Sequence, residues 1–305
     1  MIADAVFEGG GIRGIGHVGA LAYMESNGFT WARTAGSSVG ALIAALIAAG
    51  YSAKEMKNIM INTNFNKFKD RNGLSSIPLI GKPLGLLMEN AMYSGDYVEE
   101  WVSELLQHKN IINFSDISKN GEIPLKIVAS DITRRRRIVL PDDLIDYGIE
   151  PMTFPIAKAV RMSISIPFYF KPVKMKFNDT VCYVVDGCVC CSYPINIFDV
   201  EGIPRWPTIG FRFENTDTSF TSSGRTDTLS LLFDIANTMS CLQTAEHTQE
   251  YNRSRSIVIP TNGVEGIDFD ISKEKSLMLY KYGYRSAMEF LKGWNFEEYV
   301  TNFRS

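Results

Sequence analysis

The sequence lacks an apolar run long enough to cross a lipid bilayer. Its longest run, Ala41–Ala49, falls well short of the about 20 residues that a membrane-spanning helix needs. No basic region precedes an apolar stretch near the start of the chain, so we expect no secretory signal. These two absences predict a cytoplasmic protein whose contact with membranes is at most peripheral.

Neither sign of charge is in large excess. The chain has 31 Lys and Arg residues against 34 Asp and Glu, a formal net charge of -3, which gives no electrostatic reason to expect nucleic-acid binding. Of its 305 residues 45% are hydrophobic, enough for a large core. We find no repeat or low-complexity linker and predict one domain over residues 1–305, with a motif core at about 1–200 and a helical part at about 224–305.

Cysteine is scarce, and its pattern matches no metal site. Four of the five cysteines crowd into the segment 182–191, and the C-x-C-C spacing fits no zinc motif. The odd count favours thiols in a reducing compartment, with most of them serving as small apolar core side chains. We therefore expect neither a metal nor a cofactor.

The rest of the sequence alternates between apolar runs of strand character and segments with helical spacing. Ile2–Phe7 and Phe29–Ala35 are each followed by a glycine-containing turn and then by a helix, Ile15–Asn27 or Ala41–Ala49. This alternation is typical of an α/β fold with a parallel sheet. Further strands are expected at Leu125–Asp131, Arg136–Leu140, Val173–Phe177, Val181–Val185, Thr208–Phe213 and Ser256–Ile259. Further helices are expected at 52–62, Ser94–His108, Pro155–Ser163, Thr228–Tyr251 and Lys273–Lys292.

The first glycine loop reads E-G-G-G-I-R-G. Its Gly9-x-Gly11-x-x-Gly14 spacing fits a dinucleotide fingerprint, but that site also requires an acidic residue at the end of the second strand, and F-T-W-A-R-T-A has none. Consecutive glycines that expose N–H groups at a helix N-terminus instead suit an anion, including the oxyanion of a tetrahedral intermediate. Arg13 adds a fixed positive charge.

The second turn, G-S-S-V-G, contains a G-x-S-x-G pattern centred on Ser38. This is the pattern of a nucleophile elbow, in which a strand ends, the chain turns sharply and a helix begins. Gly36 and Gly40 flank the serine because a side chain there would crowd the turn. The register therefore selects Ser38 as nucleophile and leaves Ser37 as a turn residue.

A serine nucleophile needs a base, and the residues offer two kinds of candidate. The chain has three histidines, His17, His108 and His247, of which His247 would fit a Ser–Asp–His order but lies in a polar helical stretch. Asp186 ends the apolar run V-C-Y-V-V-D-G, at a strand end where α/β sheets place their sites. The same Asp-Gly pair also suits an ordinary turn.

Taken together, the motifs E-G-G-G-I-R-G, G-S-S-V-G and D-G closely resemble the patatin-like phospholipase family. Four further stretches agree with it: G-x-x-H-x-G-A-L, M-Y-S-G-D-Y-V-E-E-W, K-I-V-A-S-D-I-T and R-M-S-I-S-I-P-F-Y-F-K-P-V. The resemblance implies a three-layer α/β/α fold with a central, mostly parallel sheet. It further implies a catalytic dyad of Ser38 and Asp186 without histidine, with Gly36, Gly40 and Gly187 as supporting motif residues. The implied oxyanion hole is the loop of Gly9, Gly10, Gly11, Arg13 and Gly14, chiefly the N–H groups of Gly10 and Gly11.

Two positions depart from the family pattern. The family continues D-G-G or D-G-A and places an Asn six residues after the Asp, where this chain has Cys188 and Ser192. Cys188 is bulkier than Gly where the backbone passes the substrate, and Ser192 is shorter than Asn. Both changes bear on the level of activity, although neither removes a dyad residue.

Two segments invite an interpretation as lipid-contacting surface. Ile77–Met88 is apolar but broken by Gly and Pro, as expected of a mobile cap, an interfacial surface or a buried loop. Arg134–Arg137 is either a binding site for anionic head groups or a solvated strand start and turn. The hypothesis that follows is a phospholipid or lysophospholipid acyl hydrolase. The alternatives are a broad lipase, acyltransferase or thioesterase, and a lipid-binding regulatory protein with a decayed site.

Overall fold

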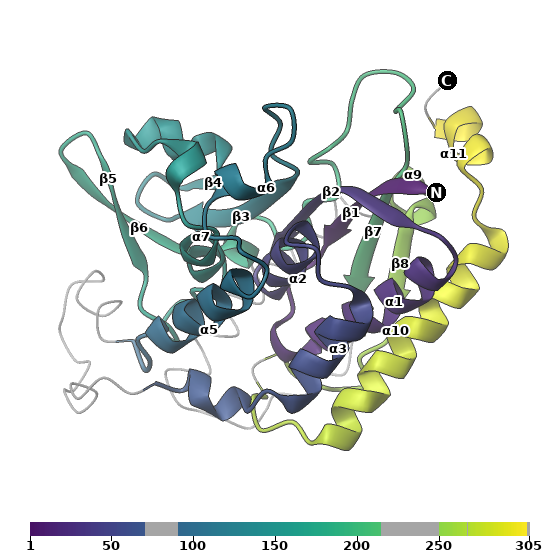
Figure 1. The fold of residues 1–305 in the computed structure, drawn as a ribbon, viewed down its shortest axis with the longest axis horizontal. Helices are drawn as coiled ribbons and strands as arrows, with labels where there is room; N and C mark the ends of the chain where they lie inside the picture. The colour runs from purple at the N-terminus through teal and green to yellow at the C-terminus, as the bar shows by residue number, and fades with distance from the viewer. Residues whose placement is uncertain (71–90, 215–249, 267, 304–305) are drawn as a thin grey trace.

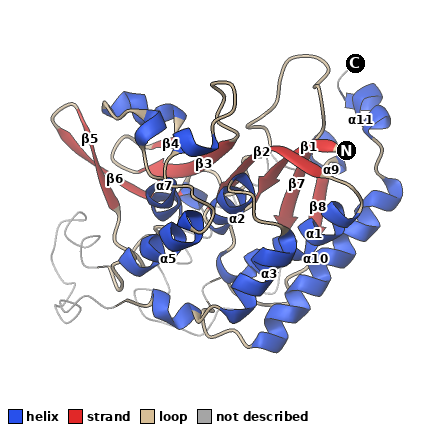
Figure 2. Ribbon diagram, viewed as in Figure 1, coloured by secondary structure: helices blue, strands red, loops and turns tan. Residues whose placement is uncertain are grey.

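A computed structural model describes residues 1–70, 91–214, 250–266 and 268–303. Its centre is an eight-stranded sheet of order β5-β6-β3-β2-β1-β7-β8, with β4 paired to β3 (Figure 1). The strands are β1 (Ile2–Phe7), β2 (Thr30–Ser37), β3 (Leu125–Asp131), β4 (Arg136–Leu140), β5 (Val173–Phe177), β6 (Thr180–Asp186), β7 (Thr208–Phe213) and β8 (Ser256–Ile259). Figure 2 shows them as a red band running across the molecule among blue helices.

The helices follow the predicted order within the described ranges. They are α1 (Ile15–Ser26), α2 (Val39–Ala48), α3 (Ala53–Asn62), α5 (Asp96–Gln107), α6 (Phe114–Ile117), α7 (Ile156–Ser163), α9 (Glu250–Ser254), α10 (Lys273–Gly293) and α11 (Phe296–Phe303). The expected helix at 228–251 and the apolar segment 77–88 lie almost wholly or wholly outside the described residues. The sequence analysis missed α6 and α11. No helix in the described ranges is both long and apolar enough to span a bilayer.

The predicted fold class is confirmed as a mixed α/β fold with a central, mostly parallel sheet. β1, β2, β7 and β8 run parallel to their neighbours. β3 is parallel to β2 but antiparallel to β4 and β6, and β5 is antiparallel to β6. On one face of β1, Phe7 joins the core that includes α1 and α2. On the other face, Val6 and Ala35 pack against Tyr193, Ile195 and Phe198.

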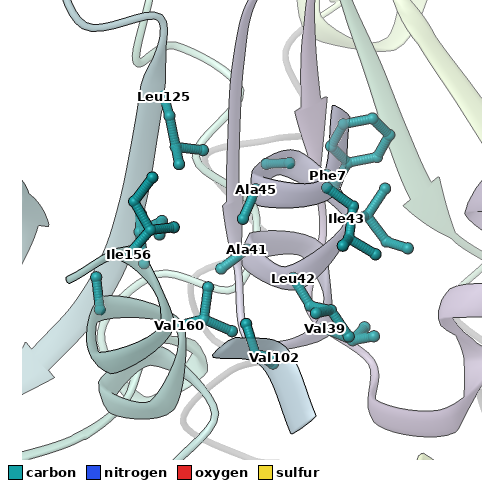
Figure 3. Close-up of a cluster of buried hydrophobic side chains, with 14 of the residues drawn as sticks. Phe7, Val39, Ala41, Leu42, Ile43, Ala45, Val102, Leu125, Ile156 and Val160 are labelled. Carbon is teal, nitrogen blue, oxygen red and sulfur yellow. The ribbon is translucent and has the colours of Figure 1, made fainter. Parts of the chain in front are cut away.

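Helix α2 is apolar all round because it is enclosed on every side. It packs on β1, β2 and β3 and also contacts α5 and α7. In Figure 3, Ala41 lies on the side of α2 toward Val160 of α7, and Ile43 lies beside Phe7 of β1. Small residues on one side of the helix and larger ones on the other let it fit between the sheet and its neighbours. This burial fixes the first residue of the helix, which directly follows Ser38.

Strand β3 has three partners, and their arrangement positions the site. β4 pairs along 127–131 and so occupies one edge, which leaves β2 and β6 to share the other. The parallel strand β2 makes its last pairing at Ser37 with Val128. The antiparallel strand β6 makes its last pairing at Asp186 with Ala129. The two strands therefore point toward each other, and their carboxyl ends meet at adjacent residues of β3.

Helices α1 and α10 approach closely through glycine. A Cβ at Gly283 of α10 would lie 1.8 Å from the carbonyl oxygen of Gly16, and a Cβ at Gly19 of α1 would lie 1.9 Å from that of Tyr280. Figure 1 shows α10 running along the molecule beside α1 and α3. Because α1 directly follows the glycine loop, α10 stabilises the helix that carries this loop.

The α1–α10 contact yields a stability prediction. Gly283→Val should lower the free energy of unfolding by about 3 kcal/mol, because the new side chain overlaps backbone that cannot move aside. Gly293→Ala is the matched control, since a Cβ there meets nothing within 4 Å, and it should change stability by less than about 0.5 kcal/mol. Urea unfolding measures both. Equal stability of the two variants would contradict a glycine-dependent contact.

Candidate active site

Ser38 alone forms the turn between β2 and α2. Strand β2 extends to Ser37 and α2 begins at Val39, so the turn is shorter than the predicted 36–40. Ser38 has φ 53° and ψ -126°, a conformation that non-glycine residues rarely adopt and that costs about 1–3 kcal/mol. A Cβ at Gly36 would lie 2.2 Å from the Gly40 carbonyl carbon, and one at Gly40 would lie 2.4 Å from the Phe7 oxygen. The predicted reason for both flanking glycines is confirmed.

The meeting of β2 and β6 brings Ser38 and Asp186 into direct contact. The Ser38 Oγ hydroxyl donates a 2.7 Å hydrogen bond to Asp186 Oδ2. The other carboxylate oxygen, Oδ1, accepts the N–H of Cys188 at 2.8 Å. Both side chains are buried. Asp186 lies at the end of a strand, as the sequence predicted, and this strand, β6, is antiparallel to β3 and reaches Ser38 from the opposite direction.

Burial changes the acidity of the groups around Ser38. Desolvation raises the pKa of Asp186 to about 6, against the lowering effect of the hydrogen bonds from Ser38 and Cys188. Burial, and then the nearby Asp186 carboxylate, raise the pKa of the Cys188 thiol well above its ordinary value. A carboxylate with a pKa near neutrality can accept a hydroxyl proton, whereas the neutral thiol is a poor nucleophile.

The glycine loop approaches Ser38 at Gly9, the residue that precedes Gly10 and Gly11. The Gly9 N–H already donates to the Ser192 carbonyl at 2.9 Å, so the expectation that Gly9 supplies an oxyanion donor is corrected. Within the described residues, the N–H groups of Gly10 and Gly11 make no hydrogen bond. A Cβ at Gly9 would lie 3.1 Å from Ser38 Cβ, which shows how closely the loop approaches the serine.

The two other predicted loop residues have structural contacts. The Arg13 Nε–H donates to the Gly10 carbonyl at 3.0 Å, and the Arg13 guanidinium lies 5.0 Å from the ring centroid of Phe213. A Cβ at Gly14 would lie 2.5 Å from Val39 Cγ2, so Gly14 lets the loop pack on the first residue of α2. Gly14 therefore shapes the loop through packing.

Cys188 and Ser192 depart from the family pattern, and both contact Gly9 of the glycine loop. The Cys188 thiol fills the space next to Gly9, where its Sγ would lie 2.2 Å from an added Cβ. Cys188 Sγ also lies 3.8 Å from Ser37 Oγ. Ser192 holds the loop through its backbone carbonyl, a bond that does not depend on the length of its side chain. At Gly187, a Cβ would lie 2.3 Å from the Val128 oxygen, so only glycine fits there.

The sequence analysis missed two serines that bind the backbone of Ser38 and Asp186. Ser163 Oγ donates to the Val128 carbonyl at 2.6 Å and accepts the Ser38 N–H at 2.9 Å. The Ser165 carbonyl accepts the Asp186 N–H at 2.9 Å. Their signal was the S-I-S stretch at the end of α7, which the sequence analysis used only as part of the family resemblance.

The histidines are not placed to act as the base in the described part of the chain. His17 is buried, and its Nε2 lies 2.9 Å from the Glu8 carbonyl oxygen. Burial lowers the pKa of His17 to about 3. His108 is exposed at the end of α5, and His247 lies outside the described residues. The Ser38 hydroxyl donates to Asp186 instead.

The arginine run is a strand start and turn balanced by acids. Arg134 and Arg136 lie within 4 Å of Asp146, at 3.7 and 3.0 Å, and Arg134 also covers the ring of Phe177. A cavity of about 550 Å³ lies elsewhere, at the amino ends of β1 and β7, with Asp4 and Thr208 among its lining residues. Within the described ranges, no three His, Cys, Asp or Glu side chains form a metal-binding group, and no disulfide links the described cysteines.

Known proteins resemble this chain in sequence and in fold. Residues 5–199 match the family model described as patatin-like phospholipase. The chain is 36% identical over 297 residues to the uncharacterized protein YqhO of Bacillus subtilis strain 168, covering 97% of this chain and 100% of that protein. It is 27% identical over 302 residues to the uncharacterized protein R571 of Acanthamoeba polyphaga mimivirus, covering 94% and 93%.

Two solved structures share the fold. VipD from Legionella pneumophila superposes with a TM-score of 0.57 at 17% identity, covering 95% of this chain and 66% of that chain. The type III effector protein ExoU gives 0.52 at 15% identity, covering 95% and 53%. This chain therefore spans about two thirds of VipD and about half of ExoU. The family match over most of the chain and the full-length similarity to YqhO lead to one conclusion: the chain belongs to the patatin-like phospholipase family, whose members are lipid acyl hydrolases.

Proposed function

We propose that this protein hydrolyses acyl esters of phospholipids and lysophospholipids through an acyl-Ser38 intermediate. The observation that carries the proposal is the 2.7 Å hydrogen bond from Ser38 Oγ to Asp186 Oδ2. The glycine loop of Gly9, Gly10 and Gly11 approaches Ser38 at Gly9, and the chain belongs to the patatin-like phospholipase family. A buried hydroxyl, a buried carboxylate and two amide donors are the parts that acyl transfer needs.

In the proposed acylation step, Ser38 Oγ attacks the ester carbonyl carbon and its proton passes to Asp186 Oδ2. The carbonyl oxygen becomes an oxyanion, which the Gly10 and Gly11 N–H groups stabilise. The intermediate collapses, the ester C–O bond breaks, and Asp186 returns the proton to the leaving alkoxide. The helix N-terminus at Val39 further favours negative charge next to Ser38.

Deacylation repeats these roles with water in place of the alcohol. Asp186 takes a proton from water, the resulting hydroxide attacks the acyl-Ser38 carbonyl, and the Ser38 oxygen leaves with the proton returned by Asp186. A base with a pKa of about 6 is mostly ionised at pH 7 and still basic enough to accept a proton. The two steps need no reactant other than the ester, this protein and water.

The proposal also includes the lipid substrate and the location of the protein. Arg13 lies near the Gly10 and Gly11 amides. In the proposal its positive charge stabilises the lipid phosphate and the oxyanion that forms at the glycine loop. Such a substrate implies peripheral contact with a membrane, and we place the protein in the cytoplasm. A broad lipase, acyltransferase or thioesterase would use the same Ser38 chemistry but would show no preference for phospholipids.

The first prediction concerns the nucleophile. Ser38→Ala should lower hydrolysis of a phospholipid mixture at least about 10³-fold, because no other group replaces its hydroxyl. Ser37→Ala is the matched control, because the Ser37 hydroxyl faces Cys188 Sγ and has no role in the proposed mechanism. This variant should keep activity within about threefold. Mass spectrometry of the digested lipids measures both losses and also reports the preferred head group.

Three results would count against the proposal. Full hydrolysis by Ser38→Ala would remove Ser38 from the mechanism. A serine-reactive phosphonate that labels another residue would do the same. Wild-type protein that shows neither a burst nor turnover with a p-nitrophenyl ester would favour a lipid-binding protein with a decayed site.

The second prediction concerns the pH dependence. Because Asp186 must be ionised to accept a proton, kcat/KM should fall about tenfold per pH unit below about pH 6. Asp186→Asn should lower kcat about 10³-fold and remove this acidic limb. A pH–rate profile between pH 4 and pH 9 measures the acidic limb in the wild type and in Asp186→Asn. An acidic limb that persists in Asp186→Asn would assign the titration to another group.

The third prediction concerns stability. The folded pKa of Asp186, about 6, exceeds its ordinary value of 3.8, so the stabilisation from its proton is complete below about pH 4 and is lost as the pH rises through 6. The Asn side chain does not titrate, so its contribution to stability does not change with pH. Relative to wild type, Asp186→Asn should therefore gain up to about 3 kcal/mol between pH 4 and pH 8. Urea unfolding at both pH values measures the change, and a constant difference would contradict it.

A further inference from the structure

One buried histidine remains outside the proposed mechanism although it lies next to the glycine loop. His17 of α1 is fully buried, and its ring lies between Phe213 at 4.2 Å and Phe7 at 5.6 Å between ring centroids. Its Nε2 lies 2.9 Å from the carbonyl oxygen of Glu8. A carbonyl oxygen can only accept, so Nε2 carries a proton and donates it to Glu8.

The Glu8 carbonyl belongs to the same peptide unit as the Gly9 N–H. His17 binds one end of this unit, and the Ser192 carbonyl accepts the N–H at its other end at 2.9 Å. A planar peptide held at both ends cannot rotate about its flanking bonds. The next two peptide units supply the N–H groups of Gly10 and Gly11, so the orientation of these groups depends on the fixed peptide.

The surrounding contacts hold His17 itself in place. The Glu8 side chain accepts the Phe213 N–H at 2.6 Å through Oε2, which ties the strand end of β1 to β7. The Phe213 ring lies against His17 and beneath the Arg13 guanidinium. A Cβ at Gly10 would lie 2.4 Å from this ring. Phe213 thus forms one wall of the loop. His17 donates to the Glu8 carbonyl, and Arg13 donates to the Gly10 carbonyl further along.

We propose that His17 is a positioning residue, which orients the Gly10 and Gly11 amides by fixing the Glu8–Gly9 peptide. The proposal rests on the proposed function, in which these amides stabilise the oxyanion. His17 does not touch the substrate and exchanges no proton during the reaction. Burial lowers the pKa of His17 to about 3, so it stays a neutral donor throughout the range in which Asp186 titrates.

The test compares variants of the full chain in hydrolysis of a p-nitrophenyl ester. His17→Leu keeps an apolar side chain of similar size without the donor and should lower kcat about 30-fold, with KM within about twofold, because misaligned oxyanion donors act in the transition state. His17→Gln can place an amide N–H near the Nε2 position and should stay within about fivefold of wild-type kcat. The midpoint of the acidic limb should be the same in all variants.

Controls separate positioning from loss of stability. Val18→Ala removes buried volume from the neighbouring position of α1 and should lower the melting temperature while leaving kcat unchanged. If His17→Leu does not fold, His17→Asn replaces it, since its shorter amide is polar but does not reach the Glu8 carbonyl. Asn should then show the loss in kcat and Gln should not.

The outcomes divide clearly. Wild-type kcat in folded His17→Leu, or an equal loss in the Gln and Leu variants, overturns the proposal. Equal loss of kcat in Val18→Ala and His17→Leu also overturns it, as does a shifted acidic limb, which would make His17 a titrating base. Ser38→Ala in the same assay tests the proposed function separately: an inactive Ser38→Ala beside a fully active His17→Leu contradicts only the role of His17.

Discussion

The site depends on two strands that end against each other on one edge of β3. β2 approaches from one direction and β6 from the other, and their last pairings fall on the adjacent residues Val128 and Ala129. Neither strand can continue, so each chain must leave the sheet at this point. Ser38 and Asp186 are the residues at which this happens, and their hydrogen bond spans the junction. Ser163 occupies the junction as well, since it bonds both the Val128 carbonyl and the Ser38 amide.

This junction also accounts for the acidity of Asp186. A strand end inside the sheet is buried, and burial raises the pKa of Asp186 to about 6. The same enclosure requires glycine wherever backbones cross, at Gly36, Gly40 and Gly187. Close packing extends outward from the junction through the glycine loop and α1 to α10. The helix that lies beyond the family match thereby supports the loop on which the oxyanion proposal rests.

Local sequence patterns predicted the features that depend on residues close together in the chain. The G-x-S-x-G register selected Ser38, and the strand and helix alternation gave the fold class and most elements. The direction of β6 relative to β3 was not readable, because a seven-residue apolar run has the same pattern in parallel and antiparallel strands. The use of the Gly9 amide by Ser192 was also hidden, since it joins residues far apart in sequence. The backbone roles of Ser163 and Ser165 are likewise contacts that only the folded chain creates.

The most direct test of the central claim is to locate the acyl group during turnover. The chain would be mixed with a lysophospholipid, quenched in acid within the first turnovers and digested with trypsin, which releases the peptide Thr34–Lys54. Fragment-ion mass spectrometry can then distinguish Ser37, Ser38 and Ser52 within it. The account predicts the mass of the fatty acyl chain on Ser38. An acyl group on another residue, or continued hydrolysis with no acylated peptide, would contradict it.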